Sequence, residues 1–186
     1  MKGLIIYNGK YGATQQYSMW LGEQLQLPIM KEDEVNEDRL RSFDFVVAAG
    51  SVYIGKWMMR DWIKHNEVIL KGKKLFSLIV CATPASMGIK QQEIAKINIP
   101  DSLYKESEIY FLPGRLVISK LSWKDRLLLK MGARLEKNPE TKARMLQDVD
   151  NVKKENLIDV IRRIKAFQFS KYGSSRVWRT QLAHEN

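Results

Sequence analysis

Cysteine and histidine are scarce in this chain of 186 residues, which contains one cysteine, Cys81, and two histidines, His65 and His184. A single cysteine cannot form an internal disulfide bond, and this usage is typical of a protein in a reducing cytosol. Two distant histidines without a cysteine pair give no metal-ligand pattern, so we expect no metal site. The sequence also lacks a nucleophile elbow and paired carboxylates. If the protein catalyses a redox reaction, we expect a cofactor to supply the chemistry.

Long apolar runs are absent as well. None approaches the roughly 20 residues that a membrane-spanning helix needs. The N-terminus shows no signal-peptide pattern, because Lys2 is followed at once by strand and turn signals. We therefore expect a cytoplasmic protein, and its length favours a single domain with a substantial core.

Positive charge is concentrated in the C-terminal two-fifths of the chain. Residues 1–113 contain 14 Lys/Arg and 13 Asp/Glu, a net charge of +1, whereas residues 114–186 contain 17 and 8, a net charge of +9. This asymmetry predicts an anionic partner, which would be a membrane surface, an acidic substrate or a nucleic acid. No recognised nucleic-acid motif is present, so nucleic acid is the least favoured of these. A generally basic, solvated surface is the alternative.

Short apolar runs alternate with helical patterns along the chain. The helical patterns include an apolar face on residues 17–25, a second on residues 58–70, a weaker one on residues 87–97, and a strong final helix around residues 157–164. Strand signals lie at Lys2–Tyr7, Phe45–Gly50, Leu75–Cys81 and Glu108–Leu112, with a weaker one at Leu27–Met30. This alternation predicts an α/β fold with a five-stranded parallel sheet, order 2-1-3-4-5, and helices on both faces.

The domain organisation follows from the same pattern. We expect a single domain over residues 1–167, with a helical insertion after the fifth strand at about residues 114–148. Residues 168–186 are predicted to form a C-terminal tail that is loosely ordered from Ser170 onward, because it contains Gly173-Ser174-Ser175.

A glycine-containing turn joins the first strand to the first helix. Its residues are Asn8, Gly9, Lys10, Tyr11, Gly12, Ala13 and Thr14. Backbone N–H groups at the start of a helix favour a phosphate. The glycines allow close approach, and Asn8, Lys10 and Thr14 add side-chain donors. The turn matches neither the nucleotide-triphosphate loop nor the dinucleotide fingerprint. It is thus either a phosphate site or an ordinary connection.

Two more loops belong to the candidate site. In parallel sheets of this order, ligands bind beyond the carboxyl ends of the strands, near the switch point between strands 1 and 3. The loop after the third strand contains Ser51, Val52, Tyr53, Ile54, Gly55 and Trp57, and the loop after the fourth contains Ala82, Thr83 and Pro84. Tyr53 or Trp57 is suited to stack on a flat ring. The alternative for Trp57 is that it begins the next helix and packs in the core.

Together the three loops resemble those of a flavodoxin, in which they hold the phosphate of FMN and cover its isoalloxazine ring. Over about residues 2–165 the sequence most resembles the menaquinone-dependent protoporphyrinogen dehydrogenase family, a flavodoxin-like family. The segments that carry this resemblance are 50–55, Pro113-Gly114-Arg115-Leu116 and 123–131. The chain departs from flavodoxins at Asn8, Gly9 and Lys10, where they carry hydroxyl groups, and in the third loop, which lacks an aromatic residue.

The resemblance implies FMN as the cofactor, two-electron dehydrogenation of a porphyrinogen-like substrate, and a quinone as the acceptor. An electron-transfer flavodoxin is the alternative. Such carriers usually dock through acidic surfaces, which the net charge of +10 disfavours. A non-redox module that binds its partner through the basic C-terminal part is the third interpretation.

The insertion contains an amphipathic helix. Ser122 and Asp125 have the spacing of a capping box, and an apolar stripe of Trp123, Leu127, Met131 and Leu135 follows, with basic residues mostly elsewhere around the helix. Such a helix suits a membrane surface, although the same pattern describes a helix packed on a core. The resemblance favours contact with a substrate or with the inner face of the cell membrane. The residues predicted to make that contact are Arg115, Trp123, Lys124, Arg126 and Lys130.

Overall fold

The structure is a computed structural model that describes residues 1–83 and 85–181, together with the side chains of these residues except 85, 144 and 171–181. Five parallel strands form its central sheet in the order β2-β1-β3-β5-β6. They are β1 (Gly3–Asn8), β2 (Ile29–Lys31), β3 (Phe45–Tyr53), β5 (Lys74–Cys81) and β6 (Glu108–Pro113). The predicted flavodoxin-like α/β fold and its strand order are therefore confirmed.

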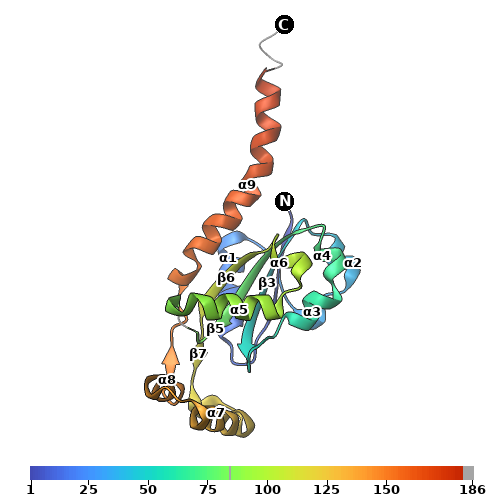
Figure 1. Ribbon diagram of the computed structural model, residues 1–186. Coiled ribbons are helices and arrows are strands. Elements are labelled where there is room, and N and C mark those ends of the chain that lie inside the picture. The colour runs from blue at the N-terminus through green and yellow to red at the C-terminus, as the bar shows by residue number, and fades with distance from the viewer. Residues whose placement is uncertain (84, 182–186) are drawn as a thin grey trace.

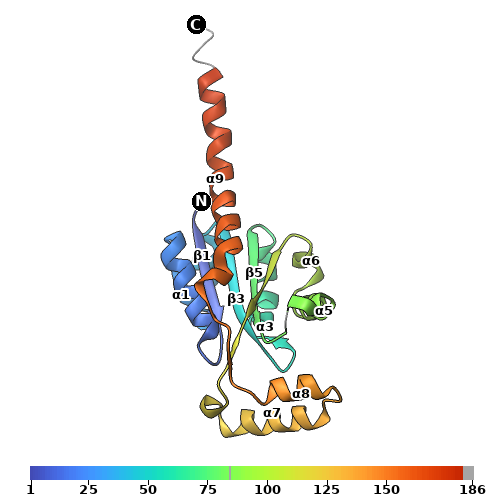
Figure 2. The same cartoon turned by 90° about the vertical axis from the view of Figure 1, so that its left-hand side faces the viewer.

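Helices cover both faces of this sheet (Figures 1 and 2). One face carries α1 (Ala13–Leu25) and the first part of α9 (Ile158–Gln181). The other carries α2 (Glu37–Arg41), α3 (Arg60–His65), α4 (Glu67–Leu70), α5 (Gly88–Asn98) and α6 (Asp101–Tyr104). Successive side chains of a strand point to opposite faces, so Leu4 and Ile6 belong to one core cluster and Ile5 to the other.

Two helical predictions need correction. The helix expected over residues 58–70 is interrupted at Asn66, which separates α3 from α4. Its side-chain amide donates to the carbonyl oxygen of Trp62, and such local side-chain bonds to the backbone compete with helix continuation. The final helix continues to Gln181, past Ser170, where we expected a loosely ordered tail.

The insertion lies beyond the carboxyl edge of the sheet, while α9 runs past the amino edge (Figure 1). The insertion contains α7 (Trp123–Leu135) and α8 (Pro139–Met145), and β7 (Arg115–Leu116) pairs with β8 (Val149–Asp150) where the chain leaves and re-enters the core. Strand β4 (Lys56–Trp57), which pairs with β3, and four short 3₁₀ helices, at Glu32–Glu34, Ala85–Met87, Ile118–Lys120 and Lys154–Leu157, complete the described elements. Over residues 1–83 and 85–181, no helix combines the length and apolar character needed to cross a membrane.

Candidate functional site

The turn after β1 presents an open helix start to the carboxyl edge of the sheet. Gly12 is the N-cap residue of α1 and has a φ of +82°, a conformation that favours glycine. The first turn of α1 contains no acidic residue. Gly9 is needed for close packing, because a Cβ atom there would lie 2.7 Å from Thr14 Oγ1. The N–H groups at this helix start are thus available to an anion.

Thr14 supplies the clearest sign of a ligand at this turn. Its side chain is almost fully buried, and within the described part of the chain its hydroxyl oxygen has no hydrogen-bond partner. Ser18, one turn further along α1, is in the same situation. Buried polar atoms nearly always have partners, since leaving one unpaired costs about 1–3 kcal/mol. An unpaired hydroxyl beside an open helix start fits the donor set that a phosphate requires.

Asn8 differs from its prediction as a phosphate donor. Its side-chain amide donates to the carboxylate of Glu32 and, at 3.4 Å, to the carbonyl oxygen of Met58. Burial raises the pKa of Glu32, and the hydrogen bond from Asn8 partly offsets this rise. The Asn8 amide therefore connects the ends of β1 and β2 with the chain before α3. These bonds direct it away from the start of α1, where a phosphate donor would be needed.

Lys10 and Tyr11 lie at the tip of the turn and reach a residue of the insertion, Asp125 of α7. Lys10 Nζ lies 2.6 Å from Asp125 Oδ2, and the hydroxyl of Tyr11 donates to the same oxygen. The hydroxyl of Tyr53 donates to Asp125 Oδ1 at 2.6 Å. The Lys10 ammonium also lies 4.3 Å from the centre of the Tyr53 ring. The hydrogen bond with Asp125 is the main cause that raises the pKa of Lys10, against an opposing effect of burial.

The loop after β3 is a hairpin rather than an open loop. Tyr53 ends β3, Ile54 and Gly55 form the turn with φ values of 49° and 72°, and β4 (Lys56–Trp57) pairs back antiparallel. Positive φ at both turn positions is the preferred geometry for a two-residue hairpin. It is unusual for a β-branched residue. Ser51 is tied to this segment, because its hydroxyl donates to the sulfur of Met58.

Trp57 packs in the core, as its stated alternative predicted, but it lies in strand β4 and not at the start of the next helix, which begins at Arg60. Its side chain is fully buried, and its indole N–H donates to the carbonyl oxygen of Gly50 at 3.0 Å. Its backbone N–H donates to Asn98 Oδ1, and the Asn98 amide donates to the carbonyl oxygen of Gly55. The buried Asn98 side chain therefore clamps the hairpin. Stacking of Trp57 on a bound ring is excluded by its burial, whereas Tyr53 is partly exposed.

The loop after β5 shows few contacts that bear on the candidate site. Ala82 is exposed, and the carbonyl oxygen of the partly buried Thr83 accepts a hydrogen bond from Gln91 of α5. Pro84 lies outside the described residues. A flavin contact by this loop stays a prediction.

The insertion residues divide into two groups. Arg115 forms an ion pair with Asp150 across β7 and β8, with 2.7 Å between Nε and Oδ2. Arg126 donates to the carbonyl oxygen of Ser119. Both cations are engaged within or at the base of the insertion, and their contact with a partner stays a prediction. Trp123, Lys124 and Lys130 are exposed, as a contact with a partner would require.

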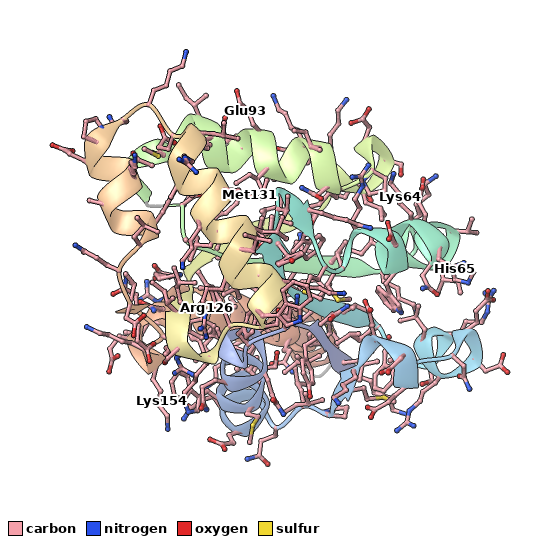
Figure 3. All side chains as sticks on the ribbon, turned by 90° about the horizontal axis from the view of Figure 1, so that it is seen from below. Lys64, His65, Glu93, Arg126, Met131 and Lys154 are labelled. Atoms are coloured by element: carbon pink, nitrogen blue, oxygen red, sulfur yellow. The ribbon has the colours of Figure 1, made fainter. Side chains whose placement is uncertain are left out.

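A surface cleft of about 660 Å³ lies beside these loops, on the α3 side. Three carboxylates, Glu32, Asp33 and Asp61, contribute to its lining, and Lys56 is paired with Asp61. The other lining residues are Asn8, Tyr53, Met58, Trp62 and His65. In Figure 3, which views the carboxyl edge from below, α7 with Arg126 and Met131 lies in front of the sheet, and His65 lies to the side, clear of α7. The acidic cleft and the basic insertion thus occupy different parts of this edge.

Two of the residues that organise the site were missed by sequence reasoning. Asp125 was recognised only for its place in the capping box, where Ser122 Oγ indeed accepts from its backbone N–H. Asn98 lies at the end of a weakly patterned helix. Asp125 is 114 residues from Tyr11 along the chain. A contact at that separation leaves no local signal.

The chain resembles known proteins both in a family model and among solved structures. A family model described as a flavodoxin domain matches residues 4–142. A comparison with curated protein sequences finds no match. Solved structures similar to the chain include the Trp repressor binding protein from Bacillus subtilis, at 12% identity and a TM-score of 0.43, with 74% of this chain and all of that chain covered. A flavodoxin from the domain Archaea is 13% identical, with a TM-score of 0.39 and coverage of 69% and 90%. The Fusobacterium nucleatum flavodoxin bound to flavin mononucleotide is 12% identical, with a TM-score of 0.37 and coverage of 59% and 69%.

Proposed function

The chain belongs to the flavodoxin domain family, an FMN-binding family, and on this basis we propose that it is an FMN-dependent oxidoreductase. The observation that carries this proposal is the open start of α1 beside the buried, unpaired hydroxyl of Thr14 in the described structure. The residues present fit a phosphate group. When bound, FMN supplies an acceptor for a hydride or for single electrons.

Each part of the site has a role in holding this cofactor. The backbone N–H groups after Gly12 and the hydroxyl of Thr14 donate to the phosphate, and Lys10 contributes positive charge. Tyr53, at the end of β3, offers a ring for stacking. Asn98 fixes the hairpin that bears Tyr53, because it bonds the backbone at both Gly55 and Trp57.

For the reaction, we propose dehydrogenation of a porphyrinogen-like substrate with a quinone as the acceptor. The sequence resemblance supports this choice, and so does the character of the insertion. The apolar stripe of α7 is exposed, and Lys124 and Lys130 are exposed beside it, at the same edge of the sheet as the cofactor loops. These features suit a quinone dissolved in a membrane and the carboxylates of a porphyrinogen. A carboxylate-bearing substrate would approach from the insertion, since the cleft on the α3 side is acidic.

Peripheral binding at the inner face of the cell membrane is part of the same proposal. The alternative is an electron carrier that docks on another redox protein. The acidic cleft of Glu32, Asp33 and Asp61 gives such a carrier one surface of the usual charge. Both functions use the same cofactor, so only the partner distinguishes them.

Anaerobic turnover with protoporphyrinogen and menaquinone tests the reaction, because exclusion of oxygen suppresses spontaneous oxidation of the substrate. We expect FMN-loaded protein to produce protoporphyrin and reduced quinone together. The matched control is the Thr14→Val variant, measured at an FMN concentration that saturates only the wild type. Its turnover should be slower than that of the wild type. FMN-loaded protein that passes electrons to a redox protein but not to menaquinone would support the carrier. Protein that binds no flavin would contradict both.

A further inference from the structure

Asp125 is exceptional among the charged residues of α7. Its side chain is only 6% exposed, whereas Lys124, Arg126, Lys130 and Arg134 are exposed. Burial of a carboxylate is costly unless the group is paired and hydrogen-bonded. Asp125 meets this need outside its own helix, through Lys10, Tyr11 and Tyr53. One carboxylate, that of Asp125, thus ties the insertion to both of the loops that are proposed to hold FMN.

The groups that Asp125 engages are those that a flavin nucleotide would use. Lys10 is the cation of the phosphate-binding turn, and its ammonium group lies 2.6 Å from Asp125 and 4.3 Å from the centre of the Tyr53 ring. A phosphate would attract this ammonium group away from Asp125. The carboxylate and the nucleotide therefore compete for Lys10. Asp125 and the phosphate also repel each other, because both are negatively charged.

We propose that Asp125 is a positioning residue that holds Lys10 in competition with the FMN phosphate and so links occupancy of the cofactor loops to the attachment of α7. This inference rests on the proposed function. Linkage is reciprocal: if Asp125 weakens phosphate binding, the phosphate weakens the attachment of the insertion through Asp125 by the same factor. Binding of FMN thereby loosens the helix that carries the exposed apolar stripe.

The experiment compares FMN with riboflavin, which has the same ring but no phosphate, on the full-length chain. Dissociation constants are measured for the wild type, for Asp125→Asn and for Glu140→Gln. The last variant removes one negative charge from an exposed residue of the insertion and serves as the control. We expect Asp125→Asn to bind FMN roughly three- to tenfold more tightly, on the scale of the net contribution of one typical hydrogen bond. Its affinity for riboflavin, and both affinities of Glu140→Gln, should change much less.

A second measurement needs no variant and covers the case in which Asp125→Asn fails to fold. Amide hydrogen exchange of residues 118–137 in the wild type should become faster with saturating FMN and should not do so with riboflavin. Unchanged or slower exchange with FMN would overturn the inference. So would an Asp125→Asn variant that binds both flavins more weakly or binds FMN as the wild type does, because Asp125 would then merely brace the loops. Wild-type protein that binds neither flavin would instead overturn the proposed function, and the inference with it.

Discussion

The central sheet and the insertion contain similar apolar residues but place them differently. Phe76 of β5 is fully buried, whereas Leu127 and Met131 of α7 are 52% and 54% exposed. Burial of apolar area holds the sheet and its helices together. The insertion relies on polar ties, including the 2.7 Å ion pair between Arg115 and Asp150. One part of the chain is thus a conventional core, and the other is a surface element attached at a few points.

The candidate site lies where these two parts meet. The core side supplies the proposed phosphate-binding turn and the hairpin that bears Tyr53, and the insertion supplies Asp125. Charge follows this division only in part, because the net positive charge that lies after residue 113 is shared between the insertion and the chain that follows it. Substitutions on the two sides should therefore have effects of different kinds as well as different sizes.

The largest expected effect comes from truncating a core side chain. Phe76→Ala removes a fully buried ring that packs edge-to-face against Phe45 and Phe167. It should lower the free energy of unfolding by about 3–5 kcal/mol. Leu127→Ala, in α7, should lower it by less than about 0.5 kcal/mol, since its side chain is half exposed. Denaturant unfolding monitored by circular dichroism measures both. Similar losses for the two variants would mean that the insertion has a buried core of its own.

The second effect concerns binding rather than stability. Replacing Lys124 and Lys130 with glutamine removes two exposed cations from α7. At about 1 kcal/mol each near an anionic membrane, the double variant should bind anionic vesicles roughly thirtyfold more weakly. The control changes Lys105 and Lys165, exposed residues outside the insertion, to glutamine. Equal weakening in the two double variants would assign vesicle binding to net charge instead of to the insertion.

Thr14→Val should act on ligand affinity and stability in opposite directions. Valine keeps the size of the buried side chain and removes a hydroxyl that has no partner in the described structure. The free energy of unfolding without ligand should stay the same or rise slightly. FMN affinity should fall by roughly tenfold, because a donor to a charged phosphate is lost. Calorimetric titration with FMN, with riboflavin as the control, measures this, and undiminished FMN affinity would remove Thr14 from the site.

The smallest effect is expected at the turn of the hairpin. Ile54 is 71% exposed and has a φ of 49°, a conformation that asparagine tolerates better than a β-branched residue. Ile54→Asn should therefore raise the free energy of unfolding by about 1 kcal/mol. Ile54→Val, which keeps the branch, should give no gain. A loss of stability on Ile54→Asn would show that the isoleucine side chain contributes contacts that outweigh the backbone strain.

The sequence predicts the sheet well, because most of the parallel strands are largely apolar runs bounded by turns or helical patterns. The edge strand β2 has only three residues and ends in exposed Lys31, and its signal was correspondingly weak. Strands β4, β7 and β8 were missed, since two residues are too short to show a period. That omission matters at the site. Pairing of Val52 with Trp57 and of Tyr53 with Lys56 places the two aromatic side chains on opposite faces of the hairpin. Treated as a loop, the segment favoured Tyr53 over Trp57 for stacking but did not exclude Trp57.

Only part of the candidate site could be predicted from the sequence. The proposed phosphate-binding turn has a local signature, because glycines precede a helix. Asp125 has none, since its partners belong to distant loops and its spacing from Ser122 already has an explanation as a helix cap. The amphipathic pattern of α7 is equally incomplete, because it describes which residues share a face but not what that face contacts. The exposure of this face depends on how the insertion packs on the rest of the chain, so it is known only from the structure.

Titration of the flavin-free wild-type chain with FMN and with riboflavin tests the central claim most directly. If the turn from Gly9 to Thr14 holds the phosphate, one FMN should bind per chain, at least roughly tenfold more tightly than riboflavin, because charge-assisted hydrogen bonds to the phosphate are lost in riboflavin. Equal affinity for the two flavins would contradict the assignment of this turn. Binding of neither would contradict the account of the chain as a flavoprotein.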